Sequence, residues 1–362
     1  MQVPPGVRRR TVAPDFEEGA PVVKRPTIAD IAKRAGVSTG AVSYALNGQP
    51  GVSTATRQRI LDIANEIGWR PNISARALSV SRVHAVGLVL ARTARTLGVE
   101  PFFMQLIAGL EAELSAKRTA LLLQVVENHD AAIEAVRMWW AERRIDGVIL
   151  TDVWQDDSRI QVVEDLGIPA VLVGRPRPDS ALPAVWSDDA AALTSAVDYL
   201  VTLGHRRIAR VAGLPALDHT QVRTEAFLAA AERHQLPGAD VVVTDYSWEA
   251  GARATRTLLT QRERPTAITF DNDVMAVAAL SVAREMGISV PADVSIVAGD
   301  DSQLCVLVHP SVTALARDIE GYGTHVARTL LAAIEDAEPP SSYQDLTAHL
   351  VPRASTAAAP AT

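Results

Sequence analysis

The segment 26–90 reads PTIADIAKRAGVSTGAVSYALNGQPGVSTATRQRILDIANEIGWRPNISARALSVSRVHAVGLVL, and its spacing predicts three short helices. Thr27 is expected to cap the first helix, because its hydroxyl can accept from the backbone N–H three residues on. Asp30 occupies the reciprocal position of such a capping box. Gly36 supplies the left-handed residue that ends the helix, and Ser38 caps a second one, Thr39 to Leu46. This pattern is typical of a helix-turn-helix.

The second helix has an apolar inner face and a polar outer face, with Ala41, Val42 and Ala45 pointing inward. In a helix-turn-helix, the second helix enters the major groove of DNA and reads base edges near its N-terminus. A third helix is expected from Ser53 to about Ile67, and an ordinary three-helix bundle is the alternative to the whole pattern. The residues of this head expected at DNA are Thr27, Ser38, Thr39, Gly40, Ser43, Tyr44 and Asn47.

The charge of the chain is unevenly distributed. Residues 24–82 hold nine Lys or Arg and three Asp or Glu, a balance of +6. Since the net charge of the whole chain is −7, the other residues together carry −13. A basic head on an acidic body is the electrostatic pattern of a DNA-binding module joined to a domain with another task.

From residue 85 onward, short apolar runs alternate with helical patterns, which predicts βαβ units and parallel sheets. Ligands bind such sheets at the carboxyl ends of the strands, and a cleft between two lobes is the place where those ends can meet. The runs are 86–90, 120–126, 147–150, 170–173, 208–212, 241–244, 267–270 and 294–297.

The chain resembles the LacI/GalR (lactose/galactose repressor) family of bacterial transcription regulators. The head carries the motifs TIADIAKRAGVS (27–38), VSYALNG (42–48), VSTATRQRI (52–60) and GWRPN (68–72). Further landmarks in the body include IDGVIL (145–150), LGHRRI (203–208), GDD (299–301) and PSVT (310–313). The resemblance covers about residues 26–350.

The resemblance implies an α/β fold: an all-α helix-turn-helix head plus a hinge helix, joined to a two-lobed periplasmic-binding-protein-like body of parallel sheets. We expect a disordered extension over 1–24, the head over 25–70, the hinge over 71–83, the effector-binding and dimerisation domain over 84–350, and a disordered tail over 353–362. The lobes are placed near 84–187 plus 319–346 and near 190–315 plus 347–352.

The resemblance also assigns the segment around Asn72, Ala75, Arg76 and Leu78 as the hinge helix. Two such hinges of a dimer would lie in the minor groove, with Leu78 as an apolar wedge that opens a base step. A simple linker is the alternative. The segment is too short to form a stable helix alone, so it should become ordered only against a partner.

Strand ends and the resemblance together indicate an effector site of Arg223, Tyr246, Asn272, Asp300 and Ile319. The forked donors of Arg223 suit ligand hydroxyls or carboxylates. Alternatively, Asn272 caps a helix and Arg223 is a solvated helix charge. The chain departs from the family pattern at Gly174 and Ile319, where many members have an acid and an aromatic residue, and at Tyr44, where many carry an arginine.

Signals for catalysis are absent from the sequence. GVSTG (36–40) fits the nucleophile-elbow pattern G-x-S-x-G, but that elbow needs a preceding strand, and here a helix precedes it. Histidines show no metal-ligand spacing, so no cofactor or metal is expected. The one cysteine, Cys305, is expected to be buried, and no run of apolar residues could span a membrane. A cytoplasmic location is therefore expected.

The sequence predicts a ligand-responsive DNA-binding transcription regulator. The expected form is a homodimeric repressor on a near-palindromic operator, controlled by a sugar or related metabolite in the inter-lobe cleft. The alternative is an intracellular small-molecule receptor without gene control, which should not show salt-dependent retention on DNA.

Overall fold

The computed structural model describes residues 26–69, 82–92, 100–335 and 341–360. By its contacts the chain divides into two compact units, 1–81 and 82–362. The first unit contains a head of three helices: α1 (Ile28–Ala35), α2 (Thr39–Leu46) and α3 (Thr54–Glu66). The hinge residues Asn72, Ala75, Arg76 and Leu78 lie outside the described residues, as does the expected N-terminal extension.

The head confirms the expected helix caps. Thr27 and Asp30 form the capping box of α1, and Gly36 ends the helix with φ 65°. Ser38 caps α2 and Ser53 caps α3, each by accepting a backbone N–H three residues on. Ile28 is 36% exposed. It occupies the first helical turn, at the edge of a core built on Ile31, Val42 and Ile60.

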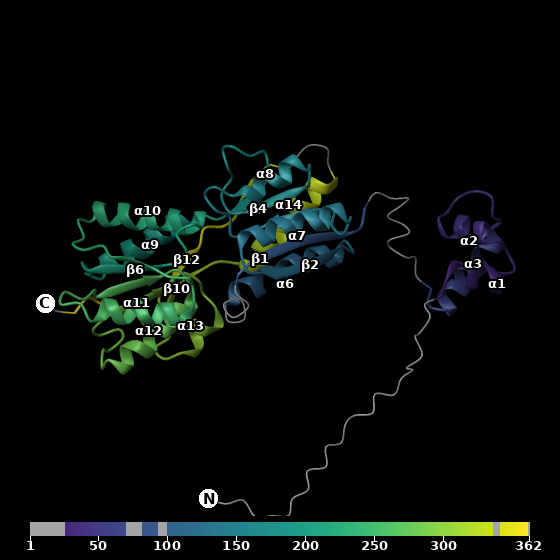
Figure 1. Cartoon of the computed structure of the whole chain (residues 1–362). Coiled ribbons are helices and arrows are strands. Elements are labelled where there is room, and N and C mark those ends of the chain that lie inside the picture. Colours follow the sequence, from purple (N-terminus) through teal and green to yellow (C-terminus); the bar gives the residue numbers. More distant parts are fainter. Residues whose placement is uncertain (1–25, 70–81, 93–99, 336–340, 361–362) are drawn as a thin grey trace, which may run out of the picture. The chain divides into compact units, whose positions relative to one another are not determined.

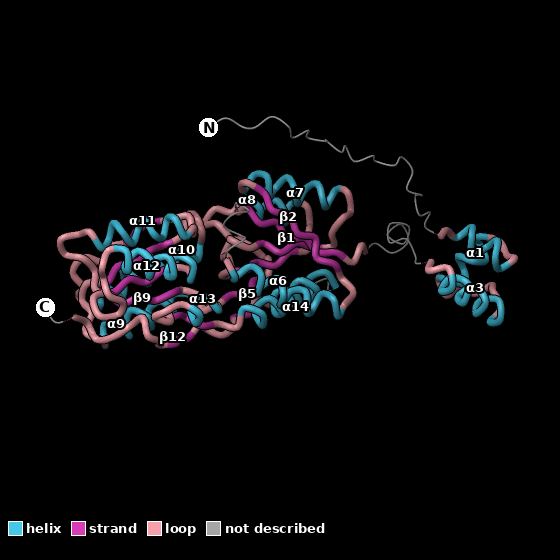
Figure 2. Tube along the Cα trace, turned by 90° about the horizontal axis from the view of Figure 1, so that it is seen from below, coloured by secondary structure: helices cyan, strands magenta, loops and turns pink. Residues whose placement is uncertain are grey.

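The second unit contains two six-stranded sheets, shown in Figures 1 and 2. The strand order of the first sheet is β11-β5-β4-β3-β1-β2, and every pairing in it is parallel. Its strands are β1 (Ala85–Ala91), β2 (Ala120–Val126), β3 (Gly147–Leu150), β4 (Ala170–Val173), β5 (Ala184–Trp186) and β11 (Tyr343–Gln344). Helices α6 (Pro101–Ala116) and α14 (Ile319–Glu335) pack on one face, and α7 (His129–Ala141) and α8 (Ser158–Asp165) on the other.

The second sheet has the order β12-β10-β9-β8-β6-β7, and only the pairing of β12 with β10 is antiparallel. Its strands are β6 (Ile208–Ala212), β7 (Val241–Val243), β8 (Ala267–Phe270), β9 (Ser295–Ala298), β10 (Thr313–Ala316) and β12 (His349–Val351). Helices α9 (Asp189–Thr202) and α10 (Asp218–Arg233) cover one face. Helices α11 (Trp248–Leu259), α12 (Asp273–Glu285) and α13 (Gln303–Leu307) cover the other face.

Judged from the described strands, the chain passes between the two sheets three times: after β5, after β10, and between β11 and β12. The parallel sheets expected from the apolar runs are confirmed. The apolar runs did not include β5, β10 or β11. Each of these strands adjoins a crossover, so the missed elements are those that join the lobes.

The tail after Arg353 was expected to be disordered, and the structure contradicts this over residues 353–360. Ser355 is fully buried, and its hydroxyl donates to the Ile296 carbonyl at 2.6 Å. The Arg353 guanidinium donates to both carboxylate oxygens of Asp301, at 2.8 and 2.6 Å. The Ala359 N–H bonds to the Leu203 carbonyl at 2.8 Å. Small residues let this segment pack closely against the second lobe, although its composition resembles that of disordered chain.

Helices α6 and α14 approach closely at two glycines. A Cβ at Gly109 would lie 1.9 Å from the Glu320 carbonyl oxygen, and one at Gly323 would lie 2.4 Å from the Leu106 carbonyl oxygen. Both neighbouring atoms are backbone and cannot rotate away. The glycines therefore set how near the two helices pack on the first sheet (Figure 2).

We expect Gly109→Ala to destabilise the body, because its new methyl group must push the helices apart. Overpacking of this kind costs about 1–3 kcal/mol. Gly40→Ala is the control: its Cβ would meet nothing nearer than Ser38 Oγ at 3.9 Å, and alanine favours a helix by about 1 kcal/mol over glycine. Urea unfolding should show a loss of stability for Gly109→Ala alone. Equal stability of wild type and Gly109→Ala would contradict the close approach.

Cys305 is buried, as the sequence predicted, and burial raises the pKa of its thiol to about 12. Among the described residues, no helix is both long and apolar enough to cross a membrane.

Candidate functional site

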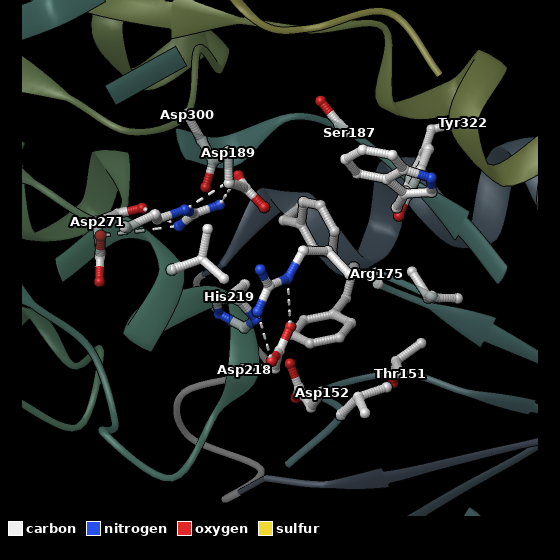
Figure 3. Close-up of a pocket in the computed structure, with 18 of the residues that line it drawn as sticks. Thr151, Asp152, Arg175, Ser187, Asp189, Asp218, His219, Asp271, Asp300 and Tyr322 are labelled. Carbon is white, nitrogen blue, oxygen red and sulfur yellow. Dashed lines mark hydrogen bonds and ion pairs between the residues drawn. The ribbon is translucent and has the colours of Figure 1, made fainter. Parts of the chain in front are cut away.

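A cavity of about 80 Å³ lies where the carboxyl ends of strands from both sheets meet (Figure 3). Arg92 follows β1, Asp152 follows β3 and Arg175 follows β4 in the first sheet. From the second sheet come Asp271 after β8 and Asp300 after β9. Strand ends of parallel sheets are where ligands bind in such folds, so the cavity is the candidate ligand site.

The structure brings three of the five expected effector residues to this cavity: Arg223, Tyr246 and Asp300 all line it. Asn272 lies just behind it, 1% exposed, where it caps α12 by accepting from Met275 N at 2.9 Å. Its amide donates to the Tyr246 carbonyl at 3.1 Å, so it supports the residue that lines the cavity.

Ile319 is not among the described residues that line the cavity. It is the first residue of α14, 4% exposed, and packs in the core of the first lobe. The expectation that it contacts a ligand is therefore wrong in this structure. Tyr322, one turn further along the helix, lines the cavity instead, and its hydroxyl donates to the Val185 carbonyl at 2.7 Å.

Tyr246 is held in one position by its backbone and its hydroxyl. Its φ is 68°, an unusual value for a residue other than glycine. Its hydroxyl forms hydrogen bonds with Thr220 Oγ1 at 2.7 Å and His219 Nε2 at 2.8 Å. A Cβ at Gly213 would lie 1.9 Å from the tyrosine ring, so this glycine leaves the space that the ring fills. Arg92 stacks on the ring with its Cζ 4.8 Å from the centroid.

Asp189, the first residue of α9 after a lobe crossover, links two arginines. Arg223 Nη2 lies 2.7 Å from its Oδ1, and Arg317 Nη1 lies 3.5 Å from the same oxygen. Burial raises the pKa of Asp189, but the two guanidiniums outweigh it and lower the pKa to about 2. Arg317 also reaches Asp300 at 3.3 Å. The carboxylate therefore stays ionised and ties the crossover segments to the cavity wall.

Two further arginine–aspartate pairs are bidentate. Arg92 binds both carboxylate oxygens of Asp152, at 2.7 and 3.0 Å. Arg175 binds both oxygens of Asp218, at 3.1 and 3.0 Å, and thereby joins a loop of the first lobe to α10 of the second. Forked pairs of this kind fix orientation as well as charge.

Backbone hydrogen bonds join the lobes beside the Arg175–Asp218 pair. The Asp218 N–H bonds to the Val153 carbonyl at 2.8 Å, and the Gln155 N–H bonds to the Ala216 carbonyl at 3.3 Å. The lobes are therefore in contact across the mouth of the cavity.

Glu100, immediately before α6, is 7% exposed, and its Oε2 has no hydrogen-bond partner among the described residues. Burial raises the pKa of its carboxyl to about 7, and the charge of Arg92 lowers it by less. The folded chain thus holds a proton here that the unfolded chain, with a pKa near 4.5, has released. The contribution of the Glu100 carboxyl to the free energy of unfolding is therefore fully present below about pH 4.5 and is lost as the pH rises to about 7.

We expect Glu100→Gln to stabilise the body at pH 8 relative to wild type, and to leave its stability near that of wild type at pH 4. One pKa unit corresponds to about 1.4 kcal/mol, so the difference between the two pH values should be on the order of 3 kcal/mol. Thermal melting of both proteins across this range measures it. A pH-independent difference would show that the raised pKa is wrong.

Several cavity residues escaped the sequence reasoning, although the strand-end rule could have found some of them. Asp152, Arg175 and Asp271 each follow a strand by one or two residues. Asp189 and Arg317 follow β5 and β10, the strands that were not recognised. His219 and Trp186 line the cavity without a sequence signal.

The head places the outer face of α2 in solvent. Thr39 and Gly40 are exposed, Ser43 is half-buried, and 49% of Tyr44 is accessible. Ser38 uses its hydroxyl to accept from Ala41 N at 3.2 Å. Two other residues of the expected DNA set bond locally: Thr27 Oγ1 donates to Asp30 at 2.7 Å, and Asn47 Nδ2 donates to Ser43 Oγ at 3.4 Å.

No group of three or more metal-ligating side chains occurs within the described parts of the chain.

Comparisons with known proteins agree with both units. Residues 27–72 match the family model of bacterial regulatory proteins of the lacI family, and residues 197–356 match a periplasmic binding protein-like domain. The HTH-type transcriptional regulator CelR of Thermobifida fusca is 33% identical over 328 residues, which cover 87% of this chain and 94% of that one.

The chain belongs to the LacI family of bacterial regulatory proteins. A structure of a CelR–cellobiose complex matches with a TM-score of 0.70 and 30% identity, over 91% of this chain and all of that one. The lac repressor dimer bound to operator and the anti-inducer ONPF matches with a TM-score of 0.81 and 25% identity, over 92% of this chain and all of that one. This LacI-family chain is a ligand-responsive, DNA-binding transcription regulator.

Proposed function

We propose that the chain is a repressor that binds a near-palindromic operator as a homodimer and is controlled by a sugar-like ligand in the inter-lobe cavity. The observation that carries the proposal is the pairing of the two units: a head that exposes a capped recognition helix, and a cavity built from the strand ends of both lobes. A ligand that touches both lobes can favour one arrangement of them over another.

Operator reading is assigned to the outer face of α2. A second helix of a helix-turn-helix lies in the major groove, and a two-fold protein reads two half-sites about one DNA turn apart. The lac repressor relative is described as a dimer on its operator, which supports the same assembly here. Tyr44 is the largest exposed side chain of the helix, so it can contact both a base edge and a thymine methyl.

A polyhydroxylated ligand suits the cavity. The aromatic side chains of Phe102 and Trp186 line the cavity and can pack against the apolar side of a sugar ring. Arg223, Asp300 and Thr151 offer donors and acceptors for hydroxyl groups. The relative in complex with cellobiose supports a sugar-class effector.

Control of DNA binding would operate through the lobe contacts. A ligand that draws Arg223 or Asp300 into new hydrogen bonds changes the links that these residues make to the crossover segments through Asp189 and Arg317. Coupling between two such sites is typically about 1–3 kcal/mol and acts equally in both directions.

The test is selection from a random duplex library with the purified full-length chain, followed by operator binding in the presence of sugars. We expect a two-fold symmetric motif and a shift in operator affinity with at least one sugar. Retention of DNA without any motif, or no retention, would overturn the operator assignment. Retention on DNA with strong salt dependence also separates a regulator from a receptor without gene control.

We expect Tyr44→Ala to change which operators the chain prefers. Loss of a base-edge contact costs about 1–3 kcal/mol of discrimination at one position of the half-site. Repeating the selection with this variant measures the change, and Arg34→Ala on α1 is the control. An unchanged motif for Tyr44→Ala would show that Tyr44 contacts no base.

Relatives of this chain are transcription regulators rather than enzymes, which supports a binding role for the cavity without catalysis. The site of action would be the cytoplasm, where the operator lies.

A further inference from the structure

The carboxylates of the cavity are almost fully matched by arginines of the same chain. Five aspartates each have a guanidinium within 3.3 Å. These pairs are Asp152–Arg92, Asp189–Arg223, Asp218–Arg175, Asp271–Arg210 and Asp300–Arg317. A ligand carboxylate or phosphate that drew one of these arginines away from its aspartate would leave that carboxylate unpaired. Leaving a buried charge unpaired is strongly unfavourable, so the cavity disfavours anionic ligands.

Glu100 is the sixth carboxylate of the cavity and the one without an ion pair among the described residues. It is 7% exposed, and its Oε2 lacks a hydrogen-bond partner within the described part of the chain. Arg92, the arginine whose charge acts most on it, is already bidentate to Asp152. His219, the one histidine that lines the cavity, cannot supply the missing charge, because burial and Arg223 lower its pKa to about 4.

The surroundings of Glu100 are suited to a cation that also carries hydroxyl groups. Phe102 and Trp186 line the same cavity, and aromatic rings attract cations and pack against sugar rings. The rings of Phe103 and Tyr246 already contact the Arg92 guanidinium, whose Cζ lies 5.7 and 4.8 Å from their centroids. Asp271 Oδ1 and Asp300 Oδ1 are two more carboxylate oxygens of the cavity without a hydrogen-bond partner in the described residues, but each lies near an arginine, Arg210 Nη2 at 2.7 Å and Arg317 Nη2 at 3.3 Å.

We propose that the effector is a polyhydroxylated ligand that carries a protonated amine, such as an amino sugar, and that Glu100 binds its ammonium group. This inference rests on the proposed function, because it names the ligand class of the same cavity. A hydroxyl group could donate to Glu100 Oε2, but it would not offset the cost of ionising this buried carboxyl, which is partly protonated at pH 7. An ammonium group supplies both the hydrogen bond and the charge.

The protonation behaviour of the acids agrees with this assignment. Burial raises the pKa of Glu100 to about 7, and the neighbouring charge of Asp300 adds to the rise. Burial likewise raises the pKa of Asp300. A cation bound at Glu100 would lower its pKa, so binding should release protons at pH 7.

The experiment compares related sugars of different charge, by calorimetry on the full-length chain at pH 7. The monosaccharides are glucose, glucosamine and glucuronate, with the galactose series beside them. Cellobiose and the β-1,4-linked glucosamine disaccharide test a larger ligand. We expect an amine to bind at least about tenfold more tightly than its neutral parent, and the acid to bind more weakly than both.

Two variants test the role of Glu100. In Glu100→Gln the ratio of amine to neutral affinity should fall to near one. Glu232→Gln removes an exposed carboxylate on α10 and should keep the wild-type ratio. Calorimetry in two buffers of different ionisation enthalpy should show proton release on amine binding by wild type, and none by Glu100→Gln.

The outcomes separate this inference from the proposed function. Binding of a neutral sugar as tight as that of its amine, binding of an acid in preference to both, or no binding by any amine would overturn the amine assignment. In the first two cases, the proposed function would still hold if the ligand that binds also shifts operator affinity. An amine preference unchanged in Glu100→Gln would show that another residue binds the ammonium group.

Discussion

Replacing Arg223 with alanine is expected to raise the effector concentration that half-shifts operator binding by roughly 10- to 150-fold, the equivalent of about 1.5–3 kcal/mol. Arg223 donates through Nε and Nη2 to Asp189 Oδ1, at 3.0 and 2.7 Å, and lines the cavity. Nη1 also donates to the Asp271 carbonyl at 3.4 Å, and the one N–H group left on each of Nη1 and Nη2 is available to ligand hydroxyls. The variant loses those donors and also frees Asp189, which connects to the crossover residue Arg317.

Arg233→Ala is the matched control for this variant. Arg233 lies in the last turn of the same helix, α10, where its side chain is 53% exposed and pairs with Asp198. An exposed pair contributes about 0–1 kcal/mol, so the operator response should stay at the wild-type value. Titration of effector against a fluorescent operator measures all three proteins. A wild-type response in Arg223→Ala would remove Arg223 from the effector site.

The second variant with a large expected effect changes the free energy of unfolding of the body. We expect Arg210→Met to destabilise the body by about 3–5 kcal/mol, because it leaves Asp271 as a buried charge without its main partner. Both side chains are 1% exposed, and Arg210 Nη2 lies 2.7 Å from Asp271 Oδ1. Arg223 is a weaker partner for Asp271, since its Nη1 is 3.8 Å from Asp271 Oδ1 and its Nε and Nη2 donate to Asp189.

The double variant Arg210→Met with Asp271→Asn distinguishes the loss of charge balance from the loss of packing. An asparagine can still accept from Gly213 N, which bonds to Asp271 Oδ2 at 2.7 Å. We therefore expect the double variant to recover a large part of the loss in a urea-unfolding experiment. If the double variant is no more stable than Arg210→Met, the unpaired charge is not the cause.

Local signals in the sequence predicted the head and the parallel sheets. Thr27, Gly36 and Ser38 act through contacts within a few residues, so their spacing alone identified the ends of α1 and α2. The apolar runs likewise predicted most strands, because strands buried on both faces are continuously apolar. The tail after Arg353 could not be predicted, since its order depends on residues as distant as Ile296.

The candidate site was predictable only in part, for a related reason. Arg223, Tyr246 and Asp300 lie at the cavity where the family pattern indicated. Asp189 and Arg317 owe their importance to crossovers that bring distant segments together, and a sequence pattern does not show such meetings. Glu100 has no motif at all. Its unusual state arises from burial, which the tertiary structure alone determines.

The most direct test of the central claim, that a ligand in the cavity controls DNA binding, is to measure effector affinity with and without bound operator, and operator affinity with and without saturating effector. Thermodynamic linkage requires the two factors to be equal. For wild type we expect the operator to change effector affinity, and the effector to change operator affinity, by the same factor of about 5–150. For Arg223→Ala at the same effector concentrations, both affinity changes should be near one. Effector binding that leaves operator affinity unchanged would contradict the account.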